Sequence, residues 1–423
     1  MHKITDMNAG AQANSELCVT LTKTLAEEVE HNREMVNNLA KIAEENGFTY
    51  MSHWLSSMST ISNAKYYPYL NEEVVKNSIE TNGKNLVDGF LKWTQDIKNE
   101  RLPKLSKLDT YKIGENLATT KGVVIYRNHI MELIHYASPY KKTFSEPLLV
   151  VPPWINKYYI MDLNPDTSFI QYCLDMEFDV YLIVWKSADE SSKSLGMKDY
   201  VEFAIRKAIE ITHKNVHLIG YCVGGIGALL TTMTDRENAI RSVTLMATPI
   251  DFSHMQEMRS ILFYGGADTI MKKIEARGYQ CGNEMLNMFC MLKPEGLVLN
   301  QIVDQYYLNK EPKDNALLYW NMDTVNIPAK LHLEYLRDFV INNSLMKEEL
   351  IYDDQHLGMN NLKTPAYVIG AEADHIVPYQ SAFALRSQNA DIEYVLTGSG
   401  HISGIINHPS REKYHYTYYD KQK

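Results

Sequence analysis

The chain has 423 residues, of which 45% are hydrophobic and 22% are charged, and these fractions are ordinary for a globular protein. Its 42 Lys and Arg residues against 52 Asp and Glu residues give a formal net charge of −10, which argues against a nucleic-acid partner because such a chain does not neutralise phosphates. The five cysteines are Cys18, Cys173, Cys222, Cys281 and Cys290. They are odd in number, scattered along the chain and without a C-x-x-C pair, which argues against a disulfide framework or a zinc knuckle and favours a reducing compartment.

The N-terminal quarter of the chain has a helical texture. Apolar residues recur at near-helical spacing from Ser15 to Asn46, and Gly47 is placed to end that helix. A polar, aromatic stretch follows at residues 52–70, and a second helical pattern runs from Glu72 to Glu100. Pro103 and the lysines around it indicate a linker. We therefore predict a helical N-terminal region over residues 1–105.

From residue 106 onward, strand and helix patterns alternate. Residues 122–137 predict two short strands, and short buried strands are predicted at 147–153, 179–185, 216–220, 242–249, 365–374 and 392–398. Helical patterns lie at 198–213, after residue 223, and at 379–389. This alternation predicts a doubly wound, parallel α/β sheet in a catalytic domain of residues 106–423. Residues from about 251 to 360 interrupt it, and we expect this insertion to form a cap over the strand ends.

A glycine-rich turn joins one of these strands to the next helix. Gly220-Tyr-Cys222-Val-Gly224-Gly225 has the pattern of a nucleophile elbow, with cysteine where serine is more usual. The glycines allow strand and helix backbones to approach closely, and the helix N-terminus favours a thiolate. The alternative interpretation is a buried, inert cysteine. The context favours a nucleophile at Cys222, whereas the other four cysteines are expected to be packing residues.

A thiol nucleophile needs a base and a group that orients the base. Asp374 ends a predicted strand and His401 follows the next one, which is the order acid, then histidine, of an α/β-hydrolase fold. His375 and His408 are the alternative bases. Oxyanion donors are expected from the N–H of Val223 and from the loop Trp154-Ile155-Asn156, because the two prolines before it carry no N–H.

Six stretches of the chain, in order over about residues 110–415, resemble the polyhydroxyalkanoate synthases, especially the class I type: PLLVVPPWINKYYIMDLNPDTSFIQY, VYLIVWKSAD, HLIGYCVGG, LVLNQIVDQYYLNKEPKDNALLYWNMDTVNIP, GAEADHIVPYQSA and GSGHISGIINHPS. The resemblance implies an α/β-hydrolase fold and an acyltransferase that polymerises (R)-3-hydroxyacyl-CoA with release of CoA, with short-chain 3-hydroxybutyryl-CoA as the expected substrate. It also implies that Cys222 accepts the acyl group, that Asp374 and His401 assist it, and that Val223 and Ile155 are the oxyanion donors. Whether Asp374 or His401 deprotonates the 3-hydroxyl stays open.

The same resemblance implies further properties. No bound cofactor or metal is expected, since CoA is part of the substrate, and Lys157 and Arg337 are candidate contacts for its phosphates. The family resemblance implies a homodimer at the surface of polyester inclusions. A cytoplasmic location is expected because no apolar run reaches the roughly 20 residues of a membrane span and the N-terminus lacks a signal-peptide pattern. Trp154 stands where related sequences often have a smaller residue. Class I members of the family normally continue well past the histidine motif into a Trp-rich tail, whereas this sequence stops soon after NHPSREK, which indicates either a short product or a truncated sequence.

Two other functions fit the same sequence. One is a thiol-dependent hydrolase of this fold, a polyester depolymerase or thioesterase, since fold alone does not separate transfer from hydrolysis. The other is an inactive, granule-associated subunit. The cysteine at the elbow and the long family-like stretches favour the polymerising enzyme.

Overall fold

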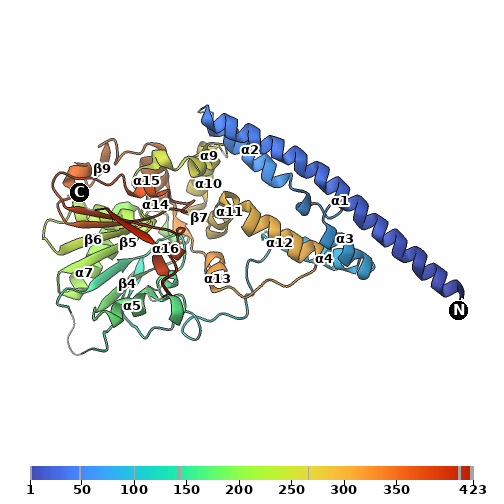
Figure 1. Cartoon of the computed structure of the whole chain (residues 1–423). Coiled ribbons are helices and arrows are strands. Elements are labelled where there is room, and N and C mark those ends of the chain that lie inside the picture. Colours follow the sequence, from blue (N-terminus) through green and yellow to red (C-terminus); the bar gives the residue numbers. More distant parts are fainter. Residues whose placement is uncertain are drawn as a thin grey trace. The chain divides into compact units, whose positions relative to one another are not determined.

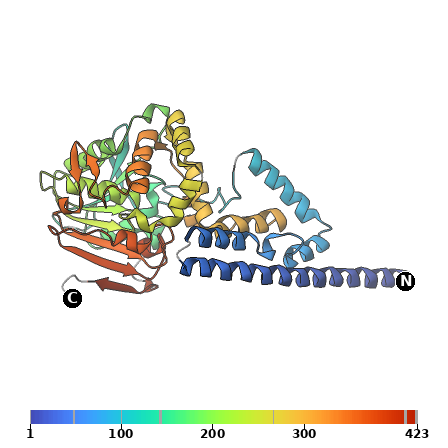
Figure 2. The same cartoon turned by 90° about the horizontal axis from the view of Figure 1, so that it is seen from above.

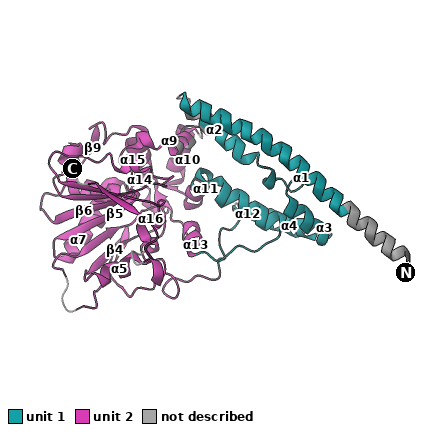
Figure 3. Cartoon of the chain, viewed as in Figure 1, with its two compact units in different colours: residues 1–108, 289–315 teal, residues 109–288, 316–423 magenta. Residues whose placement is uncertain are grey.

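The computed structural model describes residues 2–46, 49–99, 101–140, 144–264, 266–407 and 411–419. The chain divides into two compact units (Figure 3). Unit 1 contains residues 1–108 and 289–315, and unit 2 contains residues 109–288 and 316–423. Residues 289–315, which lie inside the expected cap insertion, therefore group with the N-terminal helices. The boundary after residue 105 and the cap limits stay predictions.

Unit 1 is entirely helical in its described part (Figure 1). Its elements are α1 His2–Glu45, α2 Thr49–Ile61, η1 Ala64–Tyr66, α3 Glu72–Glu80, α4 Lys84–Lys98, η7 Glu295–Leu299, α12 Asn300–Ile302 and η8 Val303–Tyr307. The helix predicted over Ser15–Asn46 lies within α1 up to Glu45, whereas its predicted stop at Gly47 lies outside the described residues. The polar, aromatic stretch at 52–70, for which the sequence predicted no element, contains most of α2 in its first half.

The single helix predicted over Glu72–Glu100 is wrong, because the chain forms two helices there. Asn82 and Gly83 have positive φ angles of 51° and 78°, a left-handed backbone that no α-helix continues through. Asn71 caps α3 by accepting a hydrogen bond from the Val74 N–H. A local turn therefore overrides an apolar pattern that reads as one continuous helix.

Unit 1 is held together by contacts between segments far apart in the sequence. Tyr66 and Val74 form a buried apolar cluster with Val303 and Leu308. Gly89 of α4 meets the backbone of η8 so closely that a Cβ would lie 1.8 Å from the Tyr306 carbonyl oxygen. The packing of 289–315 on the N-terminal helices thus depends on a glycine.

Unit 2 is built on a nine-stranded sheet in the order β1-β2-β4-β3-β5-β6-β11-β12-β13 (Figures 1 and 2). Its strands are β1 Val123–Arg127, β2 Met131–Tyr136, β3 Leu148–Val151, β4 Val180–Trp185, β5 Val216–Tyr221, β6 Ile240–Met246, β11 Ala366–Ala371, β12 Ile392–Thr397 and β13 Tyr416–Tyr419. The pairs from β4 to β12 are parallel, whereas β1, β2 and β13 pair antiparallel. The predicted parallel sheet is confirmed, and β13 is an addition that the sequence did not suggest.

The remaining elements of unit 2 cover the sheet or belong to the insertion. They are η2 Tyr158–Met161, η3 Pro165–Thr167, α5 Phe169–Asp175, η4 Glu190–Ser192, α6 Met197–Tyr200, η5 Val201–Arg206, α7 Lys207–Thr212, α8 Val223–Met233, η6 Phe252–His254, α9 Gln256–Tyr264, α10 Ala267–Arg277, β7 Tyr279–Gln280, α13 Ala316–Met322, β8 Ile327–Pro328, α14 Ala329–Glu334, η9 Tyr335–Ile341, β9 Leu350–Tyr352, β10 Gln355–Leu357, η10 Met359–Asn361, α15 Tyr379–Ala382 and α16 Ser403–Ile406. One more helix, α11 Gly282–Leu292, crosses the boundary between the units.

Two helix predictions in unit 2 had different outcomes. The pattern at 198–213 corresponds to α6, η5 and α7, which end at His213, where φ is +53°. The helix predicted at 379–389 is wrong beyond Ala382, since only α15 forms there. Among the described residues, no helix is long and apolar enough to cross a membrane.

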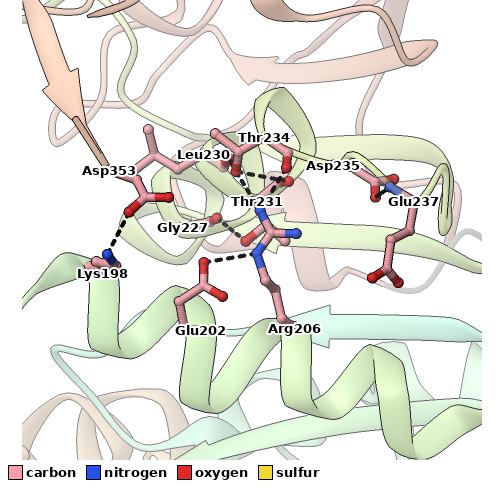
Figure 4. A network of polar contacts seen from close by, with 10 residues as sticks. All are labelled: Lys198, Glu202, Arg206, Gly227, Leu230, Thr231, Thr234, Asp235, Glu237 and Asp353. Carbon is pink, nitrogen blue, oxygen red and sulfur yellow. Dashed lines mark hydrogen bonds and ion pairs between the residues drawn. The ribbon is translucent and has the colours of Figure 1, made fainter. Parts of the chain in front are cut away.

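A groove of about 820 Å³ lies at the C-terminal end of α8. Charged side chains in and beside it contact one another (Figure 4). Arg206 donates to Glu202 at 2.9 Å and to the carbonyl oxygen of Thr234 at 2.9 Å, and Asp353, which lines the groove, pairs with Lys198. The bond from Arg206 of η5 satisfies the carbonyl oxygen of Thr234 and thereby links the C-terminal end of α8 to η5. Since α8 has 11 residues, the groove lies roughly 16 Å from the first residue of this helix.

Candidate active site

Cys222 lies at the sharp turn between β5 and α8. Its φ and ψ angles of 51° and −129° are rarely adopted by a residue with a side chain, and such strain is concentrated at functional sites. The Cys222 N–H donates to the Met246 carbonyl oxygen at 2.9 Å, and its own carbonyl oxygen accepts from the Gly225 N–H at 2.9 Å. The backbone therefore fixes the thiol at the N-terminus of α8.

The glycines of the elbow are required by packing. A Cβ on Gly220 would lie 2.4 Å from the Gly225 Cα, so strand and helix approach too closely for side chains. A Cβ on Gly224 would lie 2.4 Å from the Pro152 carbonyl oxygen at the end of β3. The pattern G-x-C-x-G-G is thus explained by the fold itself, and the predicted elbow is present.

The structure brings Asp374 and His401 together, from the segments that follow β11 and β12. Nδ1 of His401 lies 2.7 Å from Oδ2 of Asp374, and both side chains are buried. The other Asp374 oxygen accepts the N–H groups of Ile376 and Val377 at 2.9 and 2.8 Å. The carboxylate is therefore held in one orientation, with one oxygen on the imidazole.

The third member of the arrangement is the thiol. Cys222 is, with Asp374, one of the two groups that raise the pKa of His401. Burial lowers the pKa of His401, but the charges of Asp374 and Cys222 and the hydrogen bonds to both outweigh it, so its pKa is raised. The Tyr221 ring stacks on the imidazole, and its hydroxyl donates to the His401 carbonyl oxygen at 3.2 Å. This geometry can deliver and remove a proton at the sulfur.

The expected oxyanion donors occupy the two loops beside the thiol. Val223 is the first residue of α8, directly after Cys222, and Ile155 is buried in the loop after β3. The cap segment fixes that loop, because the Val325 N–H donates to the Ile155 carbonyl oxygen at 3.3 Å and Tyr159 donates to Asp323 at 2.8 Å. Their roles as oxyanion donors stay predictions.

The alternative candidates lie elsewhere. His375 is exposed, and His408 lies outside the described residues. The Arg337 guanidinium pairs with Asp338 at 2.8 Å, and the Lys157 carbonyl oxygen accepts from the Trp320 indole at 2.7 Å. A role for Lys157 and Arg337 toward CoA phosphates stays a prediction.

Two of the other cysteines are buried. Burial alone raises the pKa of Cys173 to about 12 and that of Cys290 to about 11. Neither thiol shares the polar surroundings of Cys222, which agrees with a packing role for both. Cys18 is exposed and Cys281 is partly buried.

The sequence did not point to two polar residues of the cap, His332 at the end of α14 and Tyr335 at the start of η9. Both are buried, and their ring centroids lie 5.9 Å apart. Burial raises the pKa of Tyr335, and the charge of Cys222 raises it further by a smaller amount. The one feature of the sequence that could have pointed to them is their spacing, since residues three positions apart in a helix lie on the same face. Among the described residues, no group of three or more His, Cys, Asp or Glu side chains has a geometry that could hold a metal ion.

A strand, a strained nucleophile turn and a glycine-packed helix, followed by Asp and His on later strand ends, define the α/β hydrolase fold. The sequence family described as "alpha/beta hydrolase fold" matches residues 147–407. A second family, "Poly-beta-hydroxybutyrate polymerase (PhaC) N-terminus", matches residues 13–173.

Curated relatives agree with the second match. The chain is 34% identical to poly(3-hydroxyalkanoate) polymerase subunit PhaC of Rhizobium meliloti, over 82% of this chain and 59% of the relative. Identity is 31% with the subunit of Cupriavidus necator, over 86% and 63%, and 30% with polymerase 2 of Ectopseudomonas oleovorans, over 86% and 67%. The chain belongs to the poly(3-hydroxyalkanoate) polymerase family, and it spans about three-fifths of the length of the first of these relatives.

Proposed function

We propose that this chain is an acyltransferase that polymerises (R)-3-hydroxyacyl-CoA into polyhydroxyalkanoate and releases CoA. Short-chain 3-hydroxybutyryl-CoA is the proposed substrate. The observation that carries the proposal is the buried arrangement of Cys222, His401 and Asp374 at the elbow of a chain of this family. The names of the relatives support polymerisation as the reaction. The proposal includes no bound cofactor.

In the first step, His401 takes the proton of the Cys222 thiol and the sulfur attacks the carbonyl carbon of the CoA thioester. The N–H groups of Val223 and Ile155 are the proposed donors to the oxyanion. The bond between carbon and the CoA sulfur then breaks, and the CoA thiolate takes the proton from His401. The acyl group is left as a thioester on Cys222.

In the second step, the 3-hydroxyl of an incoming acyl-CoA attacks this thioester. The new ester bond forms, the bond from carbon to Cys222 breaks, and the hydroxyl proton reaches the sulfur through the base. Asp374 has one oxygen on His401 and the other on two backbone N–H groups, and its side chain is fully buried. These contacts favour His401 as the base in this step, with Asp374 as the group that orients it.

The same site suits transfer to a hydroxyl rather than to water. Cys222 and His401 are each 7% exposed, so little solvent reaches the acylated sulfur. A thioester is also close in energy to the CoA thioester that it replaces, which keeps the acyl group ready for transfer. Exclusion of water then protects the intermediate from hydrolysis.

The test is CoA release from (R)-3-hydroxybutyryl-CoA by the purified chain, with analysis of the product. Polymer and free CoA are expected. Cys222→Ala should reduce CoA release to background and leave the fold intact, whereas Cys290→Ala, a matched change at a buried thiol in the other unit, should retain turnover. Free 3-hydroxybutyrate without polymer would instead identify a thiol-dependent hydrolase, and a folded chain without release would favour an inactive subunit.

Association with a polyester surface is a further part of the proposal. The outer side of α4 exposes large apolar side chains: Leu86, Val87, Phe90, Leu91, Trp93 and Ile97. The inner side of the helix carries the polar groups that bond to η8 and to the segment after it. This inverted distribution supports contact with an apolar surface. Pelleting of the chain with isolated polyester granules, before and after Phe90→Glu, measures it. Homodimer formation stays a prediction of the family resemblance.

A further inference from the structure

Helix α1 uses one of its sides to pack against the rest of unit 1. It lies beside α2 and also contacts α3 and η1 (Figures 1 and 2). The packed side is formed by small residues, since Thr22, Ala40 and Ala43 are buried. A different side of the helix carries large apolar side chains that are all more than half exposed: Leu17, Leu21, Leu25, Met35, Leu39 and Ile42.

A heptad spacing orders this exposed side. Eight exposed positions follow one another at alternating steps of three and four residues, which is the a/d pattern of a coiled coil. We call them the α1 stripe: Cys18, Leu21, Leu25, Glu28, Asn32, Met35, Leu39 and Ile42. The spacing continues over three and a half heptads, which is long enough for a coiled-coil seam.

The α1 stripe is complementary to itself when one copy is reversed. Read from either end, it has three apolar residues followed by one polar residue, because Glu28 and Asn32 occupy its two central positions. In an antiparallel pair centred on Glu30, each apolar residue meets an apolar residue of the second copy: Cys18 meets Ile42, Leu21 meets Leu39, and Leu25 meets Met35. Glu28 then meets Asn32, whose side-chain amide can donate to the carboxylate.

Other arrangements leave the carboxylate of Glu28 without such a donor. In a parallel pair in the same register, Glu28 faces Glu28 of the second copy, and two like charges meet inside an apolar seam. Against an apolar surface such as a polyester, the carboxylate leaves water with no hydrogen-bond partner. The antiparallel pair is therefore the arrangement that satisfies both the apolar and the polar positions of the stripe.

We propose that α1 binds a second copy of this chain through the α1 stripe, as an antiparallel coiled coil with two-fold symmetry. The same surface then serves both copies, as in other two-fold interfaces. The two central pairs of Glu28 and Asn32 fix the register, as buried polar residues do in coiled coils. This interface does not depend on acyl transfer.

The first test uses the exposed Cys18 as one of two thiol probes. Ile42→Cys in the full chain adds a second thiol at the other end of the stripe. Within one helix these positions are roughly 36 Å apart, beyond the reach of a short bis-maleimide, so a link between them joins two copies. Peptide mass spectrometry after treatment should find position 18 linked to position 42.

The control is Glu44→Cys, an exposed position on the opposite side of α1 at nearly the same height along the helix. It should give little linkage to Cys18. Linkage that is equal at positions 42 and 44, or absent from both, overturns the proposal. A wild-type chain linked from Cys18 to Cys18 of the second copy would show a parallel pair and overturn the antiparallel register.

The second test changes the polar centre in the Ile42→Cys chain. Asn32→Lys places a positive charge opposite Glu28 of the second copy, whereas Asn32→Asp places a negative charge there. The protein concentration that gives half-maximal linkage should fall about tenfold with lysine and rise about tenfold with aspartate. Both changes lie at an exposed position, so the fold of one copy is kept. Equal linkage in all three chains overturns the proposed pairing of Glu28 with Asn32.

A polyester surface is the competing occupant of the stripe. Leu25→Glu in the Ile42→Cys chain should abolish the link and leave pelleting with isolated polyester granules as in the parent chain. Loss of pelleting in Leu25→Glu, with no link in the parent chain, would assign the stripe to the polyester and overturn the pairing. None of these measurements uses acyl-CoA, so a chain that releases no CoA fails the proposed function and still decides the contact between copies.

Discussion

The charge of His401 depends strongly on its neighbours. Its folded pKa lies above the unfolded value of about 6.5, because Asp374 and Cys222 outweigh the effect of burial. A protonated His401 therefore stabilises the folded chain in full below about pH 6.5, and this contribution disappears as the pH rises through the folded pKa. The buried contacts of His401 thus link the stability of unit 2 to pH.

Asp374→Asn tests this linkage, since the amide keeps the shape but loses the charge. We expect the variant to be less stable than the wild type by about 3 kcal/mol at pH 6, the cost of leaving one partner of a buried pair unmatched. The deficit should shrink as the pH is raised, because the wild type then loses its own advantage. Urea unfolding across this pH range measures both curves, and a deficit that is constant with pH would contradict the assignment.

At the scale of an element, the elbow depends on glycines that differ in what surrounds them. A Cβ at Gly224 meets backbone oxygen at 2.4 Å, whereas a Cβ at Gly227 meets the end of the Ile205 side chain at 3.0 Å. Both residues lie in α8, where alanine is favoured over glycine by about 1 kcal/mol.

Gly224→Ala is therefore expected to destabilise the chain by about 2 kcal/mol, because the rigid loop after β3 must move. Gly227→Ala, on the same helix, should be neutral or slightly stabilising. Thermal unfolding of the two variants beside the wild type gives the comparison. Equal stability of both variants would show that α8 and the end of β3 are less tightly packed than the structure indicates.

These local features were also the ones that the sequence predicted best. The elbow, Asp374 and His401 follow buried strands of parallel pattern, and parallel strands present their carboxyl ends at one edge, so the order of these residues along the chain predicted that they meet there. The break at Asn82 and Gly83 was missed because the apolar spacing continues across it. The helix at 379–389 was overextended because its residues have helical propensity, which tertiary context overrides beyond Ala382.

At the scale of the whole molecule, no pattern in the sequence indicated that residues 289–315 pack with the N-terminal helices. Apolar and aromatic residues in that stretch look like any cap or core, and only long-range contacts separate the two. Val303 and Leu308 meet Tyr66 and Val74, more than 200 residues earlier in the chain.

The division into two units predicts that damage to one is confined to it. Gly89→Ala places a Cβ 1.8 Å from the Tyr306 carbonyl oxygen and should separate α4 from η8, whereas Gly296→Ala in η7 meets no atom within 4 Å. We expect Gly89→Ala to lower unit 1 stability by about 2 kcal/mol and Gly296→Ala to leave it unchanged or raised.

Hydrogen exchange with peptide resolution distinguishes local from global effects. In Gly89→Ala, faster exchange is expected in α3, α4 and η8, while β5 and α8 keep wild-type protection because their hydrogen bonds and packing lie within unit 2. Faster exchange at the elbow as well would mean that the two units unfold as one. Confinement would instead show that unit 2 holds the site around Cys222 without help from the stability of unit 1, since the hydrogen bonds that position Cys222, His401 and Asp374 come from residues of unit 2.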